Sequence, residues 1–95
     1  MIVAQLSIVP IGEGTSVSRY VKASIEAMRR KGIRVEPTAM CTVFEAESID
    51  EILEAVKAAH NAVLKLGAKR VITQLTVDDR RDKEATIESK LSAIK

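Results

Sequence analysis

Hydrophobic and polar residues alternate in two stretches of this chain, which predicts strands that bury one face. In residues 2–9 one face carries Ile2, Ala4, Leu6 and Ile8. In residues 69–77 one face carries Val71, Thr73, Leu75 and Val77. Two shorter stretches, residues 33–36 and 40–46, are also predicted to be strands. Pro37 follows the first of them and cannot donate to a ladder, so we expect that strand at the edge of a sheet.

Two longer stretches repeat their apolar residues at helical spacing. The first follows the turn-forming residues 12–16, where Thr15 or Ser16 is the expected N-cap. Its apolar face is formed by Val17, Tyr20, Val21, Ser24, Ile25 and Met28. The second helix begins after Ser48, where Glu51 completes a capping-box pattern. Its face is formed by Ile49, Ile52, Leu53, Val56, His60, Val63 and Leu64.

The resulting order contains two strand–helix–strand units in series. It predicts an α+β, ferredoxin-like β-α-β-β-α-β sandwich, in which a four-stranded antiparallel sheet carries two helices on one face. The alternative is an open parallel α/β sheet. Four strands and two helices are too few to cover both faces of such a sheet, so we favour the antiparallel fold.

A charged run separates this pattern from a last apolar one. Residues 78–83 are all charged, and Ile87, Leu91 and Ile94 then recur at helical spacing. We expect residues 1–95 to form one domain. Its short C-terminal helix, over residues 84–94, is expected to dock on its own body or on a neighbouring subunit.

The composition favours self-association. Aromatic residues make up only 2% of the chain, a single Tyr20 and a single Phe44, and a chain of 95 residues buries a smaller share of its surface than a larger domain does. The two helices leave one sheet face uncovered, where the first strand presents Val3, Gln5, Ser7 and Val9. This mixture of apolar and small polar groups suits a subunit interface. We therefore expect a homodimer that packs sheet against sheet, or a homotetramer built with the C-terminal helices.

Charge and cysteine content exclude several partners. The net charge of +2 is too small for a typical nucleic-acid-binding protein. The apolar residues 1–11 are too short to span a membrane and no basic segment precedes them. Cys41 is the only cysteine, so an internal disulfide is impossible. We expect a cytoplasmic protein with neither a nucleic-acid nor a membrane partner.

Few residues are candidates for chemistry. Cys41 has no assignable base and is expected to be a small buried residue. His60 is either a packing residue with one hydrogen bond or a donor or acceptor in a pocket, and no second His or Cys stands at metal-ligand spacing. Residues 12–16 form either an ordinary turn or an anion-binding nest. The nest is not a P-loop, because the Gly-Lys-Ser/Thr ending is missing.

The charged run has two interpretations. It is either a solvated loop with internal ion pairs or an arginine–carboxylate network that fixes the last helix or a neighbouring subunit. The residues of this network are Asp79, Arg80, Arg81, Asp82 and Lys83.

Several segments together resemble the small thiamine-binding protein family, long catalogued as an uncharacterised protein family. They are residues 4–12, 16–21, 37–45, 59–60, 70–73, 79–83 and 86–90. The resemblance covers essentially the whole chain, and the Arg-Arg-Asp-Lys segment at residues 80–83 is its most specific part. The family usually has a glycine where this chain has Cys41, whose side chain could narrow a nearby pocket.

The resemblance implies a ferredoxin-like fold, a dimer or tetramer, and non-catalytic binding of thiamine or its hydroxymethylpyrimidine portion, with no cofactor. An aminopyrimidine needs a donor beside an acceptor, and a thiazolium cation favours a carboxylate or an aromatic face. The candidates for the pyrimidine are Ser7, Thr38, Thr42 and His60. The candidates for the cation are Tyr20, Phe44 and Glu45. We expect His60 and Thr42 to meet in one pocket.

Two other functions stay open. An acylphosphatase-like enzyme has a similar length and fold, but residues 10–16 lack the arginine that would cradle a phosphate, and Arg19 lies inside the predicted helix. The second possibility is a purely structural oligomer with no ligand.

Overall fold

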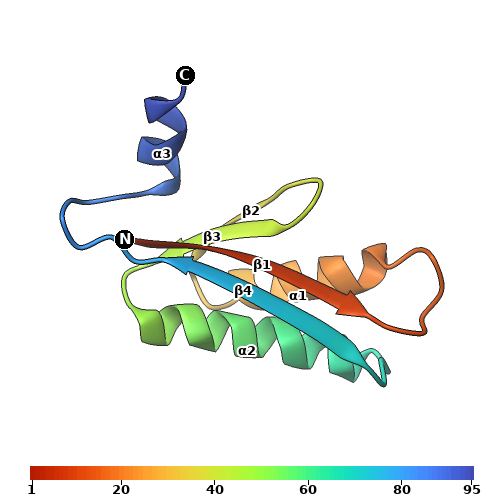
Figure 1. Ribbon diagram of the computed structural model, residues 1–95. Coiled ribbons are helices and arrows are strands. Elements are labelled where there is room, and N and C mark those ends of the chain that lie inside the picture. The colour runs from red at the N-terminus through yellow and green to blue at the C-terminus, as the bar shows by residue number, and fades with distance from the viewer.

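A central antiparallel sheet organises the fold. The structure is a computed structural model that describes residues 1–95. Its elements are β1 (Ile2–Pro10), α1 (Ser18–Arg29), β2 (Arg34–Pro37), β3 (Thr42–Ala46), α2 (Ile49–Lys65), β4 (Val71–Asp78) and α3 (Ile87–Ala93). The strand order is β2-β3-β1-β4, and each neighbouring pair is antiparallel. This confirms the ferredoxin-like fold, with α1 and α2 on one face of the sheet (Figure 1).

The core lies between the sheet and the two long helices. The alternating face of β1 is buried as predicted, with Ile2, Ala4, Leu6 and Ile8 in the core. Small residues of α2, Ala55 and Ala59, are fully buried and allow the helix to lie close to the sheet. The two aromatic side chains, Tyr20 and Phe44, are both at most 1% exposed. The core therefore contains the whole aromatic content of the chain.

The two long helices begin differently. Ser48 caps α2, because its side chain accepts the N–H of Glu51 at 3.2 Å. The predicted cap of α1 at Thr15 or Ser16 is wrong: Val17 is the N-cap and no side chain caps the helix. The physical reason is that Val17 packs against the core, which holds the chain outside the helix up to that residue. None of the three helices combines the length and the apolar character needed to cross a membrane.

The β2–β3 hairpin is tighter than predicted. We expected the third strand from residue 40, but β3 begins at Thr42. Thr38 closes the turn, because its N–H donates to the carbonyl of Cys41 at 2.8 Å and its hydroxyl accepts the N–H of Cys41 at 3.1 Å. β2 lies at the edge of the sheet, as Pro37 indicated.

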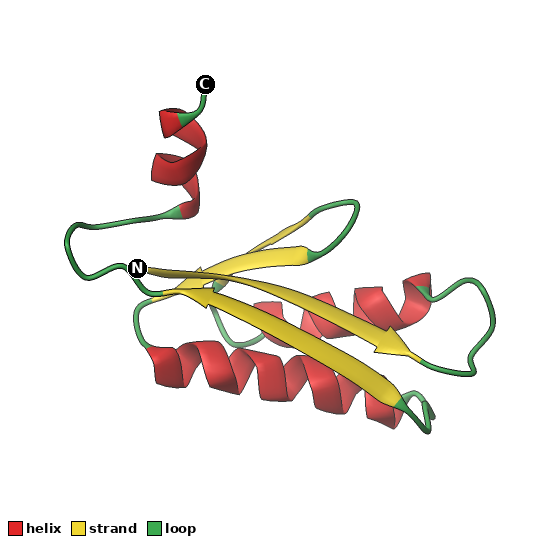
Figure 2. Cartoon of the chain, in the orientation of Figure 1, coloured by secondary structure: helices red, strands yellow, loops and turns green.

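The C-terminal helix α3 lies on the opposite side of the sheet from α1 and α2 (Figure 2). It is shorter than the expected residues 84–94. Its first turn docks on its own sheet, since Ile87 is buried and Lys90 pairs with Asp78 of β4 at 2.5 Å. Arg34 of β2 adds a contact to Glu88 at 3.0 Å. The last apolar residues, Leu91 and Ile94, stay 44% and 81% exposed, so the chain itself leaves the end of the apolar stripe uncovered.

The charged run before α3 forms two local ion pairs. Arg80 binds Asp82 through two hydrogen bonds of 2.6 and 2.9 Å, and Arg81 binds Asp79 through two of 2.9 and 2.8 Å. These guanidinium groups lower the pKa of both aspartates. Each pair spans only two residues and therefore shapes the loop itself. The structure shows the internal ion pairs, while a role toward a neighbouring subunit stays a prediction.

Candidate functional site

The sheet is incomplete beside the second half of β1. β1 pairs with β4 from Val3 to Pro10, but its pairing with β3 ends at Leu6, opposite Thr42. Residues 7–10 of β1 therefore have a strand on one side only. On the other side the tip of the β2–β3 hairpin diverges from β1 (Figure 1). This break in the sheet leaves room for another molecule.

The backbone of Ile8 faces this break. Ile11 donates its N–H to the carbonyl of Arg70 at 2.7 Å, in the register of the β1–β4 pair. Alternate residues of an antiparallel strand bond to opposite neighbours, so odd-numbered residues of β1 bond to β4 and even-numbered ones face β3. The β3 side agrees with this. Thr38 bonds to Cys41, so odd-numbered residues of β3 bond to β2 and even-numbered ones face β1. Because Ile8 has no partner in β3, its N–H and C=O point side by side into the break.

A cavity of about 210 Å³ lies at the break, between β1, α1 and the hairpin. Its apolar wall is formed by Leu6, Ile8, Val9, Val17, Val21, Pro37, Ala39 and Met40. Its polar side chains are Ser7, Ser24, Thr38, Cys41 and Thr42. Its volume is below the roughly 300–1,000 Å³ of pockets for drug-sized ligands. The cavity therefore suits a single small ring with hydrogen-bonding groups and no charge.

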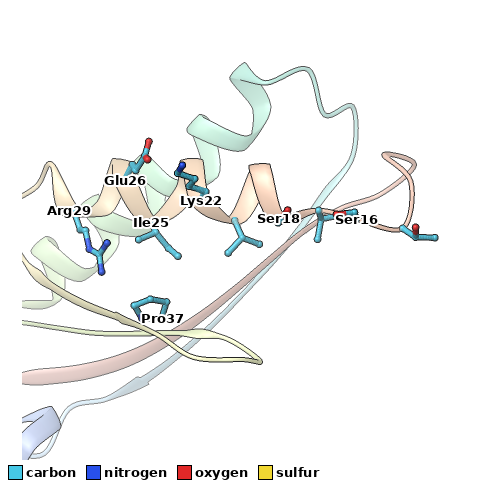
Figure 3. Close-up of a pocket in the computed structure, with 10 residues that line it drawn as sticks. Ser16, Ser18, Lys22, Ile25, Glu26, Arg29 and Pro37 are labelled. Carbon is cyan, nitrogen blue, oxygen red and sulfur yellow. The ribbon is translucent and has the colours of Figure 1, made fainter.

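A wider groove of about 600 Å³ adjoins this cavity along α1. The cavity and the groove share three apolar residues, Val17, Val21 and Pro37. Figure 3 shows Ile25 and Arg29 extending from α1 toward Pro37, whereas Lys22 and Glu26 point away from it. The groove thus combines an apolar floor with charges of both signs, and a molecule larger than one ring could extend into it.

Three of the seven predicted ligand residues, Ser7, Thr38 and Thr42, come together at the cavity. Thr42 is buried. The hydroxyl of Thr38 is already engaged in the hairpin, where it donates to the carbonyl of Cys41 at 2.8 Å. Ser7 and Cys41 also line a shallow polar depression on the open face of the sheet, so they border spaces on both faces.

Three predicted residues lie away from the cavity. Tyr20 is buried and donates its hydroxyl hydrogen to Glu13 at 2.5 Å, while Arg19 lies over its ring at 4.6 Å from the centroid. Phe44 is in the core. Glu45 is buried near α3 with Arg34 at 3.7 Å.

The structure does not bring His60 and Thr42 together. His60 shares a hydrogen bond of 2.7 Å with the hydroxyl of Thr73 in β4. Thr42 belongs to β3, and β1 lies between β3 and β4. The partner of His60 is therefore Thr73, and the prediction that His60 and Thr42 meet in one pocket is wrong.

Sequence reasoning missed the groups that shape the cavity most. They are the α1 residues Val17 and Val21, which we assigned only to the core, and the backbone of Ile8. The available signal was a mismatch in length, because a strand of nine residues has a neighbour of five. Such a mismatch leaves backbone groups unpaired, whatever the side chains are.

The comparisons with known proteins cover almost the whole chain. A family model described as "Thiamine-binding protein" matches residues 4–95. A UPF0045 protein of Methanothermobacter thermautotrophicus is 47% identical over 96 residues, which are 100% of this chain and 97% of that protein.

Solved structures agree with the fold. The crystal structure of the hypothetical protein MJ1052 of Methanocaldococcus jannaschii is 50% identical, has a TM-score of 0.91 and covers 98% of this chain and 94% of its own. A Thermotoga maritima protein, for which a role in thiamine biosynthesis or salvage has been suggested, is 26% identical with a TM-score of 0.82. That alignment covers 99% of this chain and 98% of the Thermotoga chain.

The hydrogen bond between His60 and Thr73 predicts a stability effect. We expect His60→Leu and Thr73→Val each to lower the free energy of unfolding, because the remaining partner loses its hydrogen bond. In a double-mutant cycle followed by urea unfolding, the coupling should be about 0.5–1.5 kcal/mol. Purely additive losses would contradict this role.

The Tyr20–Glu13 hydrogen bond predicts an alkaline titration. This bond, with burial, raises the pKa of Tyr20 above its usual 10.0. A raised folded-state pKa means that its contribution to stability is present below about pH 10 and is lost as pH rises through the folded value. The chain has one tyrosine and no tryptophan, so tyrosinate absorbance reports this group alone.

Glu13→Gln should shift the titration midpoint of Tyr20 down toward 10, since the carboxylate charge is removed. Glu26→Gln, which neutralises an exposed acid on the same helix as Tyr20, should leave the midpoint unchanged. An equal midpoint in wild type and Glu13→Gln would show that Glu13 does not hold the proton on Tyr20.

Proposed function

Because this chain belongs to the thiamine-binding protein family, we propose that it binds thiamine or the hydroxymethylpyrimidine portion of thiamine, without catalysing a reaction. The 210 Å³ cavity at the break in the sheet is the proposed site for the pyrimidine ring. The wider groove along α1 is the proposed place for the rest of the molecule.

The backbone of Ile8 is the observation that carries this proposal. The 4-aminopyrimidine edge has an amino donor directly beside a ring-nitrogen acceptor. An extended residue without a strand partner presents an N–H beside a C=O, which matches that edge with two hydrogen bonds. The apolar wall from Val17 and Val21 would cover the faces of the ring, and Thr42 adds a hydroxyl at the side.

The charged part of thiamine is proposed to lie outside the cavity. No charged side chain lines the cavity, and burying an unpaired thiazolium there would be costly. The one acid that borders the adjoining groove, Glu26, points away from Pro37, so we propose that the thiazolium stays solvated at the rim of the groove instead of pairing inside it. On this model the pyrimidine supplies specificity and the thiazolium contributes little.

Binding is favoured over acylphosphatase-like catalysis by the position of Arg19. An enzyme of that type would need an arginine free to cradle a phosphate. Here the guanidinium of Arg19 lies over the ring of Tyr20 and donates to its hydroxyl at 2.8 Å. Arg19 therefore has a structural partner within the fold.

Ligand analogues test the site directly. At a hundred times its dissociation constant, thiamine or hydroxymethylpyrimidine should stabilise the protein by roughly 2.7 kcal/mol in thermal unfolding. The 4-oxo analogue reverses the donor and the acceptor and leaves backbone groups unpaired, at a cost of about 1–3 kcal/mol. We therefore expect it to bind about 5- to 150-fold more weakly by calorimetry.

Two threonine variants locate the site. Thr42→Val removes a hydroxyl from the cavity and should weaken binding of the pyrimidine. Thr76→Val makes the same chemical change on the open face, outside the cavity, and should not. Equal binding of the amino and oxo compounds would exclude recognition by Ile8, and failure of every compound to bind would exclude the proposed ligand.

We also propose that the protein acts as a homo-oligomer. The open face of the sheet carries Val9 and Ile72, which are cross-strand neighbours and 41% and 44% exposed. Helix α3 lies on the same side of the sheet (Figure 2), and the chain carries the exposed Leu91 within this helix and Ile94 just after it. A second copy packed on this face would bury both groups and bring the α3 helices into the interface.

Sedimentation tests this assembly. Leu91→Glu should weaken self-association, because it places a charge in the proposed interface, while the folded monomer should be little affected since Leu91 is 44% exposed. Ser92→Glu adds the same charge at a neighbouring polar position and serves as the control. Equal sedimentation of Leu91→Glu and wild type would place the interface elsewhere.

A further inference from the structure

One cation of the groove along α1 has no acidic partner. Arg29 is the last residue of α1 and extends toward Pro37 across the groove (Figure 3). Its guanidinium donates one hydrogen bond, to the carbonyl of Val35 at 3.3 Å, and forms none of the ion pairs of the chain. A guanidinium carries several N–H donors in a planar fork. Arg29 therefore has most of its donors free at the groove.

The topology keeps the nearest acid of β2 away from Arg29. Successive residues of a strand point to opposite faces of the sheet. Val35 is in the core beneath the helices, so Glu36 points to the open face. There Glu36 accepts a hydrogen bond from Arg34 at 3.1 Å. The sheet thus separates this carboxylate from the groove.

The charges on the helix side leave Arg29 uncompensated as well. The charged residues that line the groove are Lys22, Glu26 and Arg29. Lys22 and Glu26 lie about one helical turn apart and both point away from Pro37 (Figure 3), so their charges offset each other at the rim. The positive charge of Arg29 remains inside the groove, which favours an anionic ligand group there and disfavours a cationic one.

The distance from the cavity to Arg29 limits where that anionic group stands on the ligand. Val21 lines both the cavity and the groove, and Arg29 follows on the same side of the helix with Ile25 between them. This separation along α1 corresponds to a rise of about 12 Å. In an extended phosphate ester of thiamine, roughly eight bonds, or about 10 Å, separate the pyrimidine ring from the phosphorus. The reach of the arginine side chain covers the remainder.

We propose, building on the function proposed above, that the site selects phosphate esters of thiamine and that Arg29 binds the phosphate. The pyrimidine then lies in the cavity, the thiazolium at the rim, and the phosphate at the end of the groove. A phosphate monoester carries about −1.5 to −2 charges at pH 7, so the ester is negative overall although its thiazolium is positive. Free thiamine is a cation. The guanidinium fork can donate two parallel hydrogen bonds to the phosphate oxygens.

The phosphate group can be tested with three ligands. By calorimetry at low salt, thiamine monophosphate should bind the wild type about tenfold more tightly than thiamine does. The ratio should fall as salt is added, because Arg29 is exposed to solvent. The phosphate of hydroxymethylpyrimidine phosphate lies only about 4 Å from the ring. That compound should therefore bind no more tightly than hydroxymethylpyrimidine, and an equal gain for this short ester would overturn the assignment to Arg29.

Two arginine variants locate the phosphate. Arg29→Gln should bring the affinities of thiamine monophosphate and thiamine to about the same value, since the charge that separates them is gone. Binding of thiamine and of hydroxymethylpyrimidine should be unchanged, which shows that the variant is folded. Arg30→Gln makes the same change at the next residue, which does not line the groove, and should keep the tenfold preference.

The outcomes separate this inference from the function on which it rests. If thiamine binds and its monophosphate binds no more tightly, phosphate selection is wrong while the proposed pyrimidine site stands. If Arg29→Gln keeps the preference for the monophosphate, Arg29 is not the phosphate ligand. If none of the compounds binds, the proposed function fails and the phosphate site fails with it.

Discussion

The unequal pairing of β1 is the constraint on which the rest of the structure depends. β1 is paired over eight residues with β4 but over only five with β3, so its two sides are supported unequally. Where both neighbours are present, one face of β1 forms the centre of the core. Where only β4 is present, the same strand keeps its apolar side chains in place but has a free backbone on the other side. β1 thus supplies both the centre of the core and the unpaired backbone beside the cavity.

Backbone groups, more than side chains, determine what this fold can recognise. The chain has few aromatic residues, and both are buried in the core. Its only histidine is engaged with Thr73. Apart from charged side chains, the hydrogen-bonding capacity that remains lies along strands, at Ile8 beside the hairpin and along the outer side of β4. At Ile8 an N–H and a C=O stand free side by side, which is the arrangement that the proposed aminopyrimidine ligand requires.

The sequence allowed the fold to be predicted because each element is determined by local signals. Alternation placed the buried face of β1 and separated the two faces of β4, of which the face of Val71, Thr73, Leu75 and Val77 is half-buried, and Ser48 marked the start of α2. The start of α1 was predicted wrongly, because packing of Val17 on the core outweighed the capping preference of Thr15 and Ser16. The site was only partly predictable. Side-chain type pointed to Thr42 and Ser7, whereas the break beside Ile8 depends on where the β2–β3 hairpin turns, which follows from contacts between distant segments.

The position of β1 in the sheet also has a consequence for how the protein folds. Leu6 pairs with Thr42 and Val3 pairs with Asp78, so the central strand meets partners that are separated from it by about 36 and 75 residues of chain. Closing such long loops has an entropic cost before the contacts compensate for it, which slows folding. During synthesis β1 is made first and β4 last. β1 therefore waits for β3 on one side and much longer for β4 on the other, and the side that β4 will cover is exposed to aggregation during that interval.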